Sequence, residues 1–177
     1  MHHFDFNRLI FLDETGLNTK MENQYGYAPI GKRCCVKVPH GHWNSTTLIA
    51  AMTCNEVIAP MLFDGPMDGP SFAAWFETQL SPCLKPNDIV FLDNLASHLN
   101  EDVKRLAAAK GAYVIPLPEY SPDLNPIEKV WSKIKAFIRA IGPRTFSALK
   151  KAVRMALDTV TASDCLAFYN HIKTVTI

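Results

Sequence analysis

The sequence has no long hydrophobic run. None of its stretches approaches the roughly eighteen consecutive apolar residues of a membrane-spanning helix. The first residues, Met1 to Phe6, lack the basic segment followed by an apolar segment that is typical of a secretory signal. We therefore predict a cytoplasmic protein that does not act in a membrane.

The cysteines lack the spacing of a structural framework. There are five, an odd number; Cys34 and Cys35 are adjacent, the others are scattered, and no pair follows a CxxC spacing. This pattern argues against a set of disulfides and against a zinc knuckle. A reduced, intracellular environment fits it best.

Net charge is nearly absent, at +1, but the charges are unevenly placed. From Lys129 to Arg154 the chain carries eight basic residues and no acidic one. One interpretation is a solvated helical face, and the other is a surface for a polyanion such as nucleic acid. The charge pattern leaves both open.

The chain has room for one domain with a substantial core, at 177 residues and 48% hydrophobic content. Apolar runs bounded by turn residues predict strands at 9–12, 34–38, 46–53, 57–63, 88–93 and 112–116. Helical spacing predicts helices from Ser71 (the expected N-cap) to before Pro82, and at 100–110, 126–141 and 145–160. An antiparallel meander followed by strand–helix–strand units indicates an α/β fold with a mixed sheet.

Three carboxylates occupy unusual positions in this pattern. Asp13 ends the apolar run 9–12, Asp93 ends the run 89–92, and Glu128 falls in the first turn of a helix, beside its apolar stripe. Each has an ordinary explanation on its own, as a turn residue or a helix cap. Because a buried charge needs a partner, the set of three instead suggests a shared cation. Carboxylates suit Mg²⁺, and a pair of such ions suits phosphate chemistry.

These carboxylates stand in three motifs: FLDE at 11–14, FLDN at 91–94 with His98 following, and YSPDLNPIE at 120–128 with Trp131 following. Thirty-four residues separate Asp93 from Glu128. With these motifs the chain resembles the catalytic domain of DDE transposases of the mariner superfamily, in the branch found as bacterial insertion sequences. Residues 27–33 also resemble a strand-turn region of that family.

The resemblance implies a ribonuclease H-like fold, with a mixed five-stranded sheet flanked by helices. It implies that Asp13, Asp93 and Glu128 hold two Mg²⁺ ions, for which Mn²⁺ can substitute. The expected activity is cleavage of DNA at transposon ends, followed by attack of a 3′-hydroxyl on target DNA at TA sites. DNA and, in the active complex, a second copy of the chain are the expected partners.

Further residues receive roles from their places in the motifs. We expect supporting roles for Glu14, Asn94, His98 and Asn125, although His98 could equally cap a following helix. The expected DNA contacts are Lys32 and Arg33, in a predicted turn, and Lys135 and Arg139, on the same helical stripe as Glu128.

Members of this family carry an N-terminal helix-turn-helix domain. We expect residues 1–177 to form a single catalytic domain without it, in a bacterial cytoplasm and associated with the nucleoid. Two other functions remain in view: a ribonuclease H-like nuclease that only hydrolyses, and a non-catalytic DNA-binding remnant of a transposase.

Overall fold

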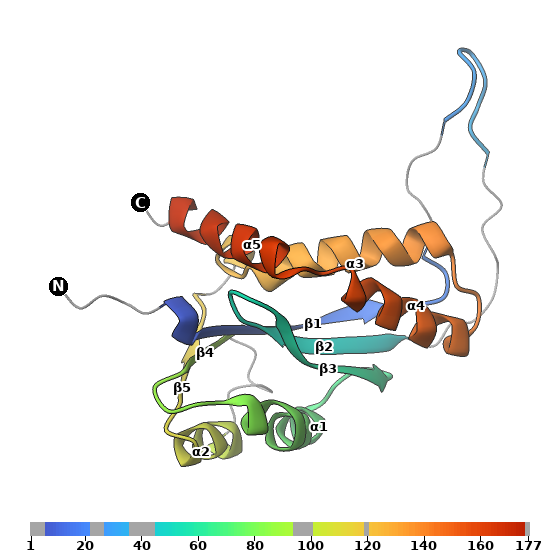
Figure 1. Ribbon diagram of the computed structural model, residues 1–177. Helices are drawn as coiled ribbons and strands as arrows, with labels where there is room; N and C mark the ends of the chain where they lie inside the picture. The colour runs from blue at the N-terminus through green and yellow to red at the C-terminus, as the bar shows by residue number, and fades with distance from the viewer. Residues whose placement is uncertain (1–5, 22–26, 36–44, 94–100, 119–120, 176–177) are drawn as a thin grey trace.

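A five-stranded sheet forms the centre of the molecule (Figure 1). The computed structural model describes residues 6–21, 27–35, 45–93, 101–118 and 121–175. The strands are β1 (Leu9–Leu17), β2 (Thr46–Met52), β3 (Val57–Asp64), β4 (Ile89–Leu92) and β5 (Tyr113–Pro116). Their order across the sheet is β3-β2-β1-β4-β5, with β1, β2 and β3 antiparallel and β1, β4 and β5 parallel. The predicted mixed five-stranded sheet is confirmed.

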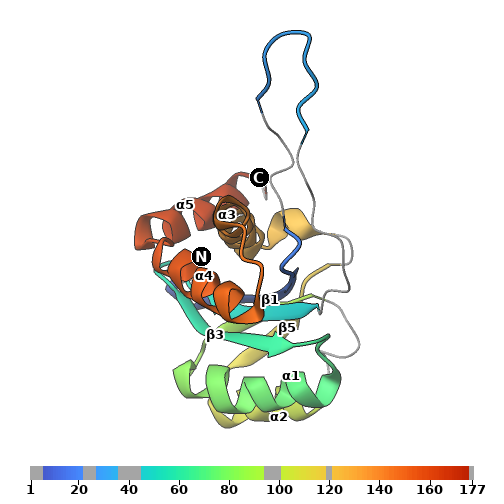
Figure 2. The same ribbon diagram turned by 90° about the vertical axis from the view of Figure 1, so that its right-hand side faces the viewer.

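Helices cover both faces of this sheet (Figures 1 and 2). They are α1 (Gly69–Trp75), α2 (Glu101–Ala109), α3 (Ile127–Ile141), α4 (Phe146–Asp158) and α5 (Ala162–Val175), with short 3₁₀ or π turns at Phe6–Arg8, Phe76–Leu80, Ser81–Cys83 and Pro122–Leu124. One face carries α1 and α2, and the other carries α3, α4 and α5. Central strands covered in this way need apolar side chains on both faces, and every residue of β2 is buried.

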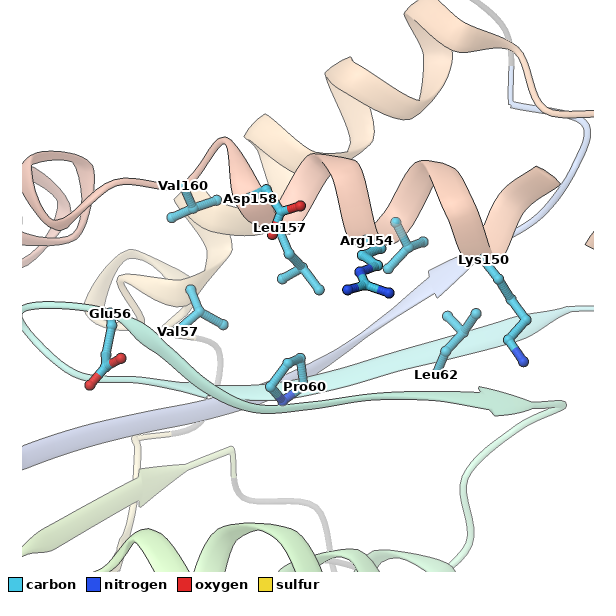
Figure 3. Close-up of a pocket in the computed structure, with 10 residues that line it drawn as sticks. Glu56, Val57, Pro60, Leu62, Lys150, Arg154, Leu157, Asp158 and Val160 are labelled. Carbon is cyan, nitrogen blue, oxygen red and sulfur yellow. The ribbon is translucent and has the colours of Figure 1, made fainter. Parts of the chain in front are cut away.

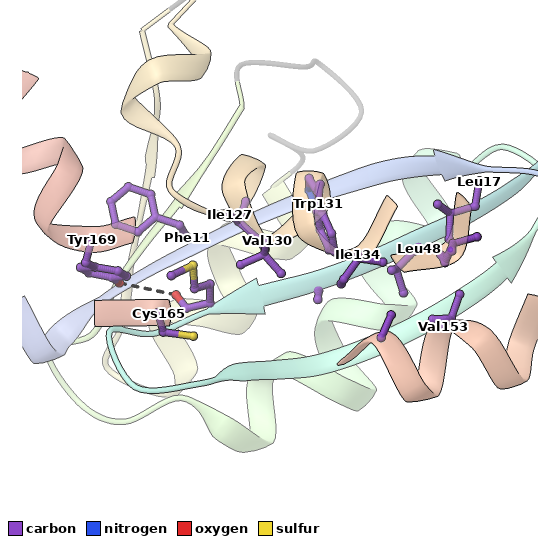
Figure 4. Close-up of a cluster of buried hydrophobic side chains, with 14 of the residues drawn as sticks. Phe11, Leu17, Leu48, Ile127, Val130, Trp131, Ile134, Val153, Cys165 and Tyr169 are labelled. Atoms are coloured by element: carbon purple, nitrogen blue, oxygen red, sulfur yellow. Dashed lines mark hydrogen bonds between the residues drawn. The ribbon is translucent and has the colours of Figure 1, made fainter. Parts of the chain in front are cut away.

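The two faces give two apolar cores. The core beneath α3, α4 and α5 is shown in Figure 4 and includes Phe11, Val130, Trp131, Leu149 and Tyr169. The core beneath α1 and α2 holds the side chains that alternate with these along β1 and β4, together with those of the helices. The predicted apolar stripe of α3 is confirmed for five residues, which are all buried in the first core: Ile127, Val130, Trp131, Ile134 and Ile138. Ile141, the sixth residue predicted in the stripe, is the last residue of the helix and is 45% exposed.

Several predicted elements need correction. β1 continues to Leu17, because β2 pairs with it over Phe11 to Leu17, so Asp13 lies within a strand instead of ending one. Cys34 and Cys35 are not in a strand, and the rest of the predicted strand 34–38 lies outside the described residues. Between the predicted strand 112–116 and the predicted helix 126–141 the chain forms a short 3₁₀ turn at Pro122–Leu124.

Two helix predictions also change. The N-cap of α1 is Asp68, whose carboxylate accepts a hydrogen bond from the Ser71 backbone N–H, so the prediction of Ser71 was wrong. α5 was not predicted at all. Its start is nevertheless marked in the sequence, because Thr161 and Asp164 form a reciprocal capping box with each other's backbone N–H groups.

A projecting arm leaves the body between β1 and β2 and includes residues 27–35 (Figure 1). At its tip the Lys32 N–H donates to the carbonyl oxygen of Pro29, and Gly31 supplies the positive φ of 79° that this tight turn needs. Tyr27 and Ile30 on this arm are fully exposed. Within the described ranges, no helix is both long and apolar enough to cross a membrane.

Candidate active site

Asp13 lies at the centre of the candidate site, on the sheet face covered by α3. It shares this face with Phe11, two residues earlier on β1, because side chains alternate along a strand. The carboxyl group is 9% exposed. The carboxyl is thus buried inside a strand, directly after four apolar residues, where only specific partners make it tolerable.

Asp93 directly follows β4, the strand that pairs with β1, and lies beside Asp13. β1 and β4 pair in parallel with Phe11 opposite Phe91. β4 ends at Leu92, and continuing the same register by two residues places Asp93 opposite Asp13. Asp93 is half-buried and sits at the carboxyl end of a parallel strand, the edge where ligands bind in open α/β sheets.

Glu128, the third carboxylate, is supplied by α3 and is close enough for its charge to act on Asp13. It is exposed and lies in the first turn of α3, where the helix dipole favours a negative charge. Its two neighbours toward the core, Ile127 and Trp131, fix that end of α3 against the sheet. The three predicted carboxylates are therefore supplied by β1, the end of β4 and the start of α3.

The electrostatics of Asp13 indicate that the three carboxylates are neighbours. The pKa of Asp13 is raised from 3.8 to about 7, chiefly by burial, with further contributions from the negative charges of Glu128 and Asp93. Hydrogen bonds from the Glu14 backbone and from the Trp131 side chain act in the opposite direction. Positive charge nearby would therefore favour the ionised form of Asp13.

The donor set suits a divalent cation. Carboxylate oxygens are the ligands that Mg²⁺ and Mn²⁺ take in proteins, and the repulsion that raises the Asp13 pKa is the kind that a bound cation relieves. Across the described part of the chain, no three acidic, histidine or cysteine side chains already stand close enough to hold one ion. The carboxylates are within electrostatic reach of each other but do not form a closed cage.

Trp131 is the site residue that reasoning from sequence missed. Its indole Nε1–H donates a buried hydrogen bond of 3.0 Å to Oδ2 of Asp13. Helical spacing places Trp131 on the apolar stripe of α3, and its side chain is only 1% exposed. The available signal was its position three residues after Glu128, which places both on neighbouring parts of the helix surface.

Asn125 supports the start of α3. It is buried, and its backbone carbonyl accepts from the Glu128 N–H at 3.2 Å. Its side-chain Oδ1 is buried without a hydrogen-bond partner among the described residues. Asn125 lines a cavity of about 240 Å³ that also borders Glu128, Lys129 and Ser132. The predicted supporting residue is therefore next to Glu128.

Of the other predicted supporting residues, only Glu14 is described, and it does not join this cluster. Glu14 follows Asp13 on β1, and alternation along the strand places its side chain on the opposite sheet face. Asn94 and His98 lie outside the described residues.

The predicted DNA contacts fall into two groups. Lys135 and Arg139 are half-buried on α3, seven and eleven residues after Glu128, so they continue its side of the helix. Lys32 and Arg33 are exposed on the projecting arm, away from the carboxylates (Figure 1). The structure brings only the first pair onto the helix that carries Glu128.

A groove separate from the Asn125 cavity lies beside α4. It has a volume of about 540 Å³ and runs between α4 and the edge strand β3 (Figure 3). Two cations, Lys150 and Arg154, and two acids, Glu56 and Asp158, line it. These charges balance, and none of the three carboxylates borders the groove. The candidate site is the carboxylate cluster at the sheet edge.

A sequence family matches most of the chain. Residues 8–150 match the family described as DDE superfamily endonuclease, and this range contains Asp13, Asp93 and Glu128. The chain belongs to this family. A search among curated protein sequences finds no match.

Solved structures with a similar fold are known for this DDE endonuclease domain. The chain is similar to the Mos1 transposase paired-end complex with left transposon end, at a TM-score of 0.75 and 16% identity, over 96% of this chain and 53% of that one. It is also similar to the catalytic domain of Mos1 mariner transposase, at a TM-score of 0.66 and 15% identity, over 96% of this chain and 78% of that one. The predicted ribonuclease H-like fold is confirmed.

The lengths differ. This DDE endonuclease chain spans about half the length of the transposase in the paired-end complex. The similarity therefore covers the catalytic part of that relative, and it extends over nearly the whole of this chain.

Proposed function

We propose that this chain is the catalytic domain of a DNA transposase, which cleaves DNA strands and joins a 3′-hydroxyl end to target DNA. The observation that carries the proposal is the buried carboxyl of Asp13, whose pKa is raised to about 7 beside Glu128 and Asp93. A buried acid with two acidic neighbours is typical of a functional site and costs stability in a purely structural one. Membership of the DDE endonuclease family supports the same conclusion.

Two Mg²⁺ ions, or Mn²⁺ ions, are the proposed cofactors, held by Asp13, Asp93 and Glu128. Two similar solved structures are described as Mos1 mariner paired-end complexes with Mg and with Mn. When bound, such ions activate the attacking oxygen and stabilise the leaving one. The chain's own contribution is to hold three oxygen donors from β1, β4 and α3 at one edge of a rigid sheet.

DNA is the proposed partner, and Lys135 and Arg139 are the proposed phosphate contacts beside the carboxylates. The relatives in the paired-end and strand transfer complexes are transposases on DNA. We further propose that the chain belongs to the bacterial insertion-sequence branch, targets TA dinucleotides and works as a homodimer. The projecting arm, with exposed Tyr27, Ile30, Lys32 and Arg33, offers apolar and basic surface for such an assembly.

The test uses the purified chain, a supercoiled plasmid and a short duplex with a free 3′-hydroxyl. We expect Mn²⁺-dependent nicking of the plasmid and covalent joining of the duplex to it. Asp93→Asn removes one proposed ligand while keeping nearly the same shape. It should lower both activities by more than the about 100-fold typical for loss of an outer-shell partner.

Each result has a distinct meaning. Unchanged activity in Asp93→Asn, with the fold intact by circular dichroism, would show that the site is misassigned. Nicking without joining, even with the duplex in excess, would favour the nuclease that only hydrolyses. Specific DNA binding without any metal-dependent cleavage would favour the non-catalytic remnant.

A further inference from the structure

The hydrogen bond between Trp131 and Asp13 joins two elements of the candidate site. Nε1 of Trp131 on α3 donates to Oδ2 of Asp13 on β1 at 3.0 Å, in a buried environment. The indole has a single N–H and no acceptor, so this contact uses its whole hydrogen-bonding capacity. A buried hydrogen bond to a charged or polarised acceptor is among the stronger ones in proteins.

The bond also distinguishes the two oxygens of Asp13. Oδ2 is engaged by the indole, and the strand holds the rest of the residue through its pairing with Ala50 of β2. Rotation of the carboxyl group would break the contact and leave the buried indole N–H without an acceptor, at a cost of about 1–3 kcal/mol. The carboxyl also accepts a hydrogen bond from the Glu14 backbone, so the indole and the strand together restrain the orientation of the carboxyl plane.

The indole itself has little freedom to move. Trp131 is 1% exposed and packs with Ile127, Val130 and Ile134 in the core under α3 (Figure 4). Such close packing permits few rotamers. Because Trp131 lies one turn beyond Glu128 on the same helix, the indole also ties the turn that carries Glu128 to the strand that carries Asp13.

We propose that Trp131 is a positioning residue for the cation site: its indole N–H holds Oδ2 of Asp13 and so restrains the orientation of that carboxyl group, and it sets the position of Glu128 relative to Asp13. This inference rests on the proposed function, because it assigns a role within the same metal site. It differs from simple core packing in that it depends on the N–H group and not on the size of the ring.

The experiment measures Mn²⁺ binding by calorimetry in wild-type protein, Trp131→Phe and Trp75→Phe. The phenylalanine at 131 keeps an aromatic ring and removes the donor. Trp75 is a matched control, because it is equally buried and its Nε1 donates at 3.0 Å to the Ala59 carbonyl oxygen on the other face of the sheet. We expect Trp131→Phe to weaken Mn²⁺ affinity by about 10- to 100-fold, as for other groups that orient metal ligands. Trp75→Phe should leave the affinity unchanged.

The stoichiometry separates positioning from folding. A merely destabilised protein binds fewer ions per chain with unchanged affinity, whereas a misplaced carboxylate binds with lower affinity. In the nicking assay, Trp131→Phe should need more Mn²⁺ for half-maximal rate and recover most of the maximal rate at high Mn²⁺. Wild-type affinity in a folded Trp131→Phe protein would overturn the inference and leave the proposed function standing. Absence of Mn²⁺ binding by wild-type protein would overturn both.

Wild-type protein gives a second readout if Trp131→Phe does not fold. Mg²⁺ is titrated while the indole N–H resonances are followed by nuclear magnetic resonance, with Trp75→Phe used to assign the control signal. We expect the Trp131 signal to shift with the binding curve and the Trp75 signal to stay in place. A Trp131 signal that does not respond to saturating Mg²⁺ would overturn the inference.

Discussion

Asp13 places a carboxyl group at the fifth residue of β1, directly after four buried apolar residues. The protein retains it by giving it one indole donor and by surrounding it with two more acids. In the absence of a cation this arrangement favours the protonated form of Asp13 in the folded state. A carboxylate suited to hold a cation therefore destabilises the folded protein when the cation is absent. This cost in stability depends on pH and can be measured.

We expect Asp13 to make the protein less stable as the pH rises. Its pKa is about 7 in the folded protein and 3.8 in the reference state, so the folded protein retains a proton that the unfolded chain releases. The stabilisation from this group is therefore fully present below about pH 4 and lost as the pH rises through about 7, by at most about 1.4 kcal/mol per pH unit. Asp13→Asn removes this dependence. Urea unfolding in a chelating buffer should find the variant more stable than wild-type at pH 8.

The comparison between the two proteins isolates Asp13, because other groups titrate in both. Asp164, for example, has a pKa lowered to about 2 by Lys133 and by Thr161, and it contributes equally to each protein. Parallel stability curves for wild-type and Asp13→Asn would contradict the assignment. Added Mn²⁺ at pH 8 should stabilise wild-type protein, since a ligand that binds only the folded state raises its stability, and should have little effect on the variant.

At the scale of elements, α5 completes the core over β1 and β2. Its Tyr169 hydroxyl donates to the carbonyl oxygen of Leu9 and lies 3.5 Å from that of Met52, while its ring meets Phe11 edge-on (Figure 4). At the start of α5, Asp164 accepts from Lys133 of α3 at 2.7 Å. The helix therefore links the strand that carries Asp13 to the helix that carries Glu128.

We expect Tyr169→Phe to destabilise the protein by about 1–3 kcal/mol, because it removes the only group that Tyr169 adds beyond its ring and leaves a buried strand carbonyl with one partner fewer. Urea unfolding measures this change. Tyr113→Phe is the matched control, since Tyr113 is 61% exposed. The control should change stability by less than about 0.5 kcal/mol. Equal effects in the two variants would show that the buried hydroxyl contributes nothing specific.

Sequence patterns predicted the elements whose signals are local. The apolar stripe of α3, the glycine that ends it at Gly142 and the buried run of β2 are all visible in the chain and confirmed in the structure. β1 was predicted too short because its second half is polar. Those residues are held in a strand by pairing with β2, which is a contact between distant segments. α5 was missed although Cys165, Phe168, Tyr169 and Ile172 have helical spacing.

The candidate site was predictable to a similar degree. The motifs singled out three carboxylates, and the structure places them on neighbouring elements, with Glu128 and Asp93 both acting on Asp13. The hydrogen bond from Trp131 was not predictable, because a tryptophan in an apolar stripe has the same pattern whether or not its N–H has a polar partner. Alternation along β1 could have warned that Glu14 faces away from Asp13.

At the scale of the whole molecule, the two faces of the sheet differ in charge. The segment from α3 to α4 contains all eight basic residues between Lys129 and Arg154. Two of them make hydrogen bonds within the protein: Lys133 donates to Asp164 and to the Thr159 carbonyl oxygen, and Arg144 donates to the Thr19 carbonyl oxygen. On the opposite face, the basic residues of α2 are matched by acids of the same helix. The basic segment 129–154, which the sequence alone left open as a solvated face or a polyanion surface, thus lies on the same side of the sheet as Glu128.

This asymmetry predicts where DNA binds. We expect the double variant Lys135→Gln/Arg139→Gln to weaken binding to a duplex and to flatten its salt dependence. Each lost phosphate contact should reduce the slope of log affinity against log salt by roughly 0.9, because fewer counterions are released. Fluorescence anisotropy at several salt concentrations measures this slope.

The matched control is Lys104→Gln/Arg105→Gln on α2, where the two cations pair with Glu101 at 2.8 Å and Asp102 at 3.1 Å. The control should leave the slope unchanged. If both double variants flatten it equally, DNA is attracted by overall charge and not held along α3 beside the carboxylates.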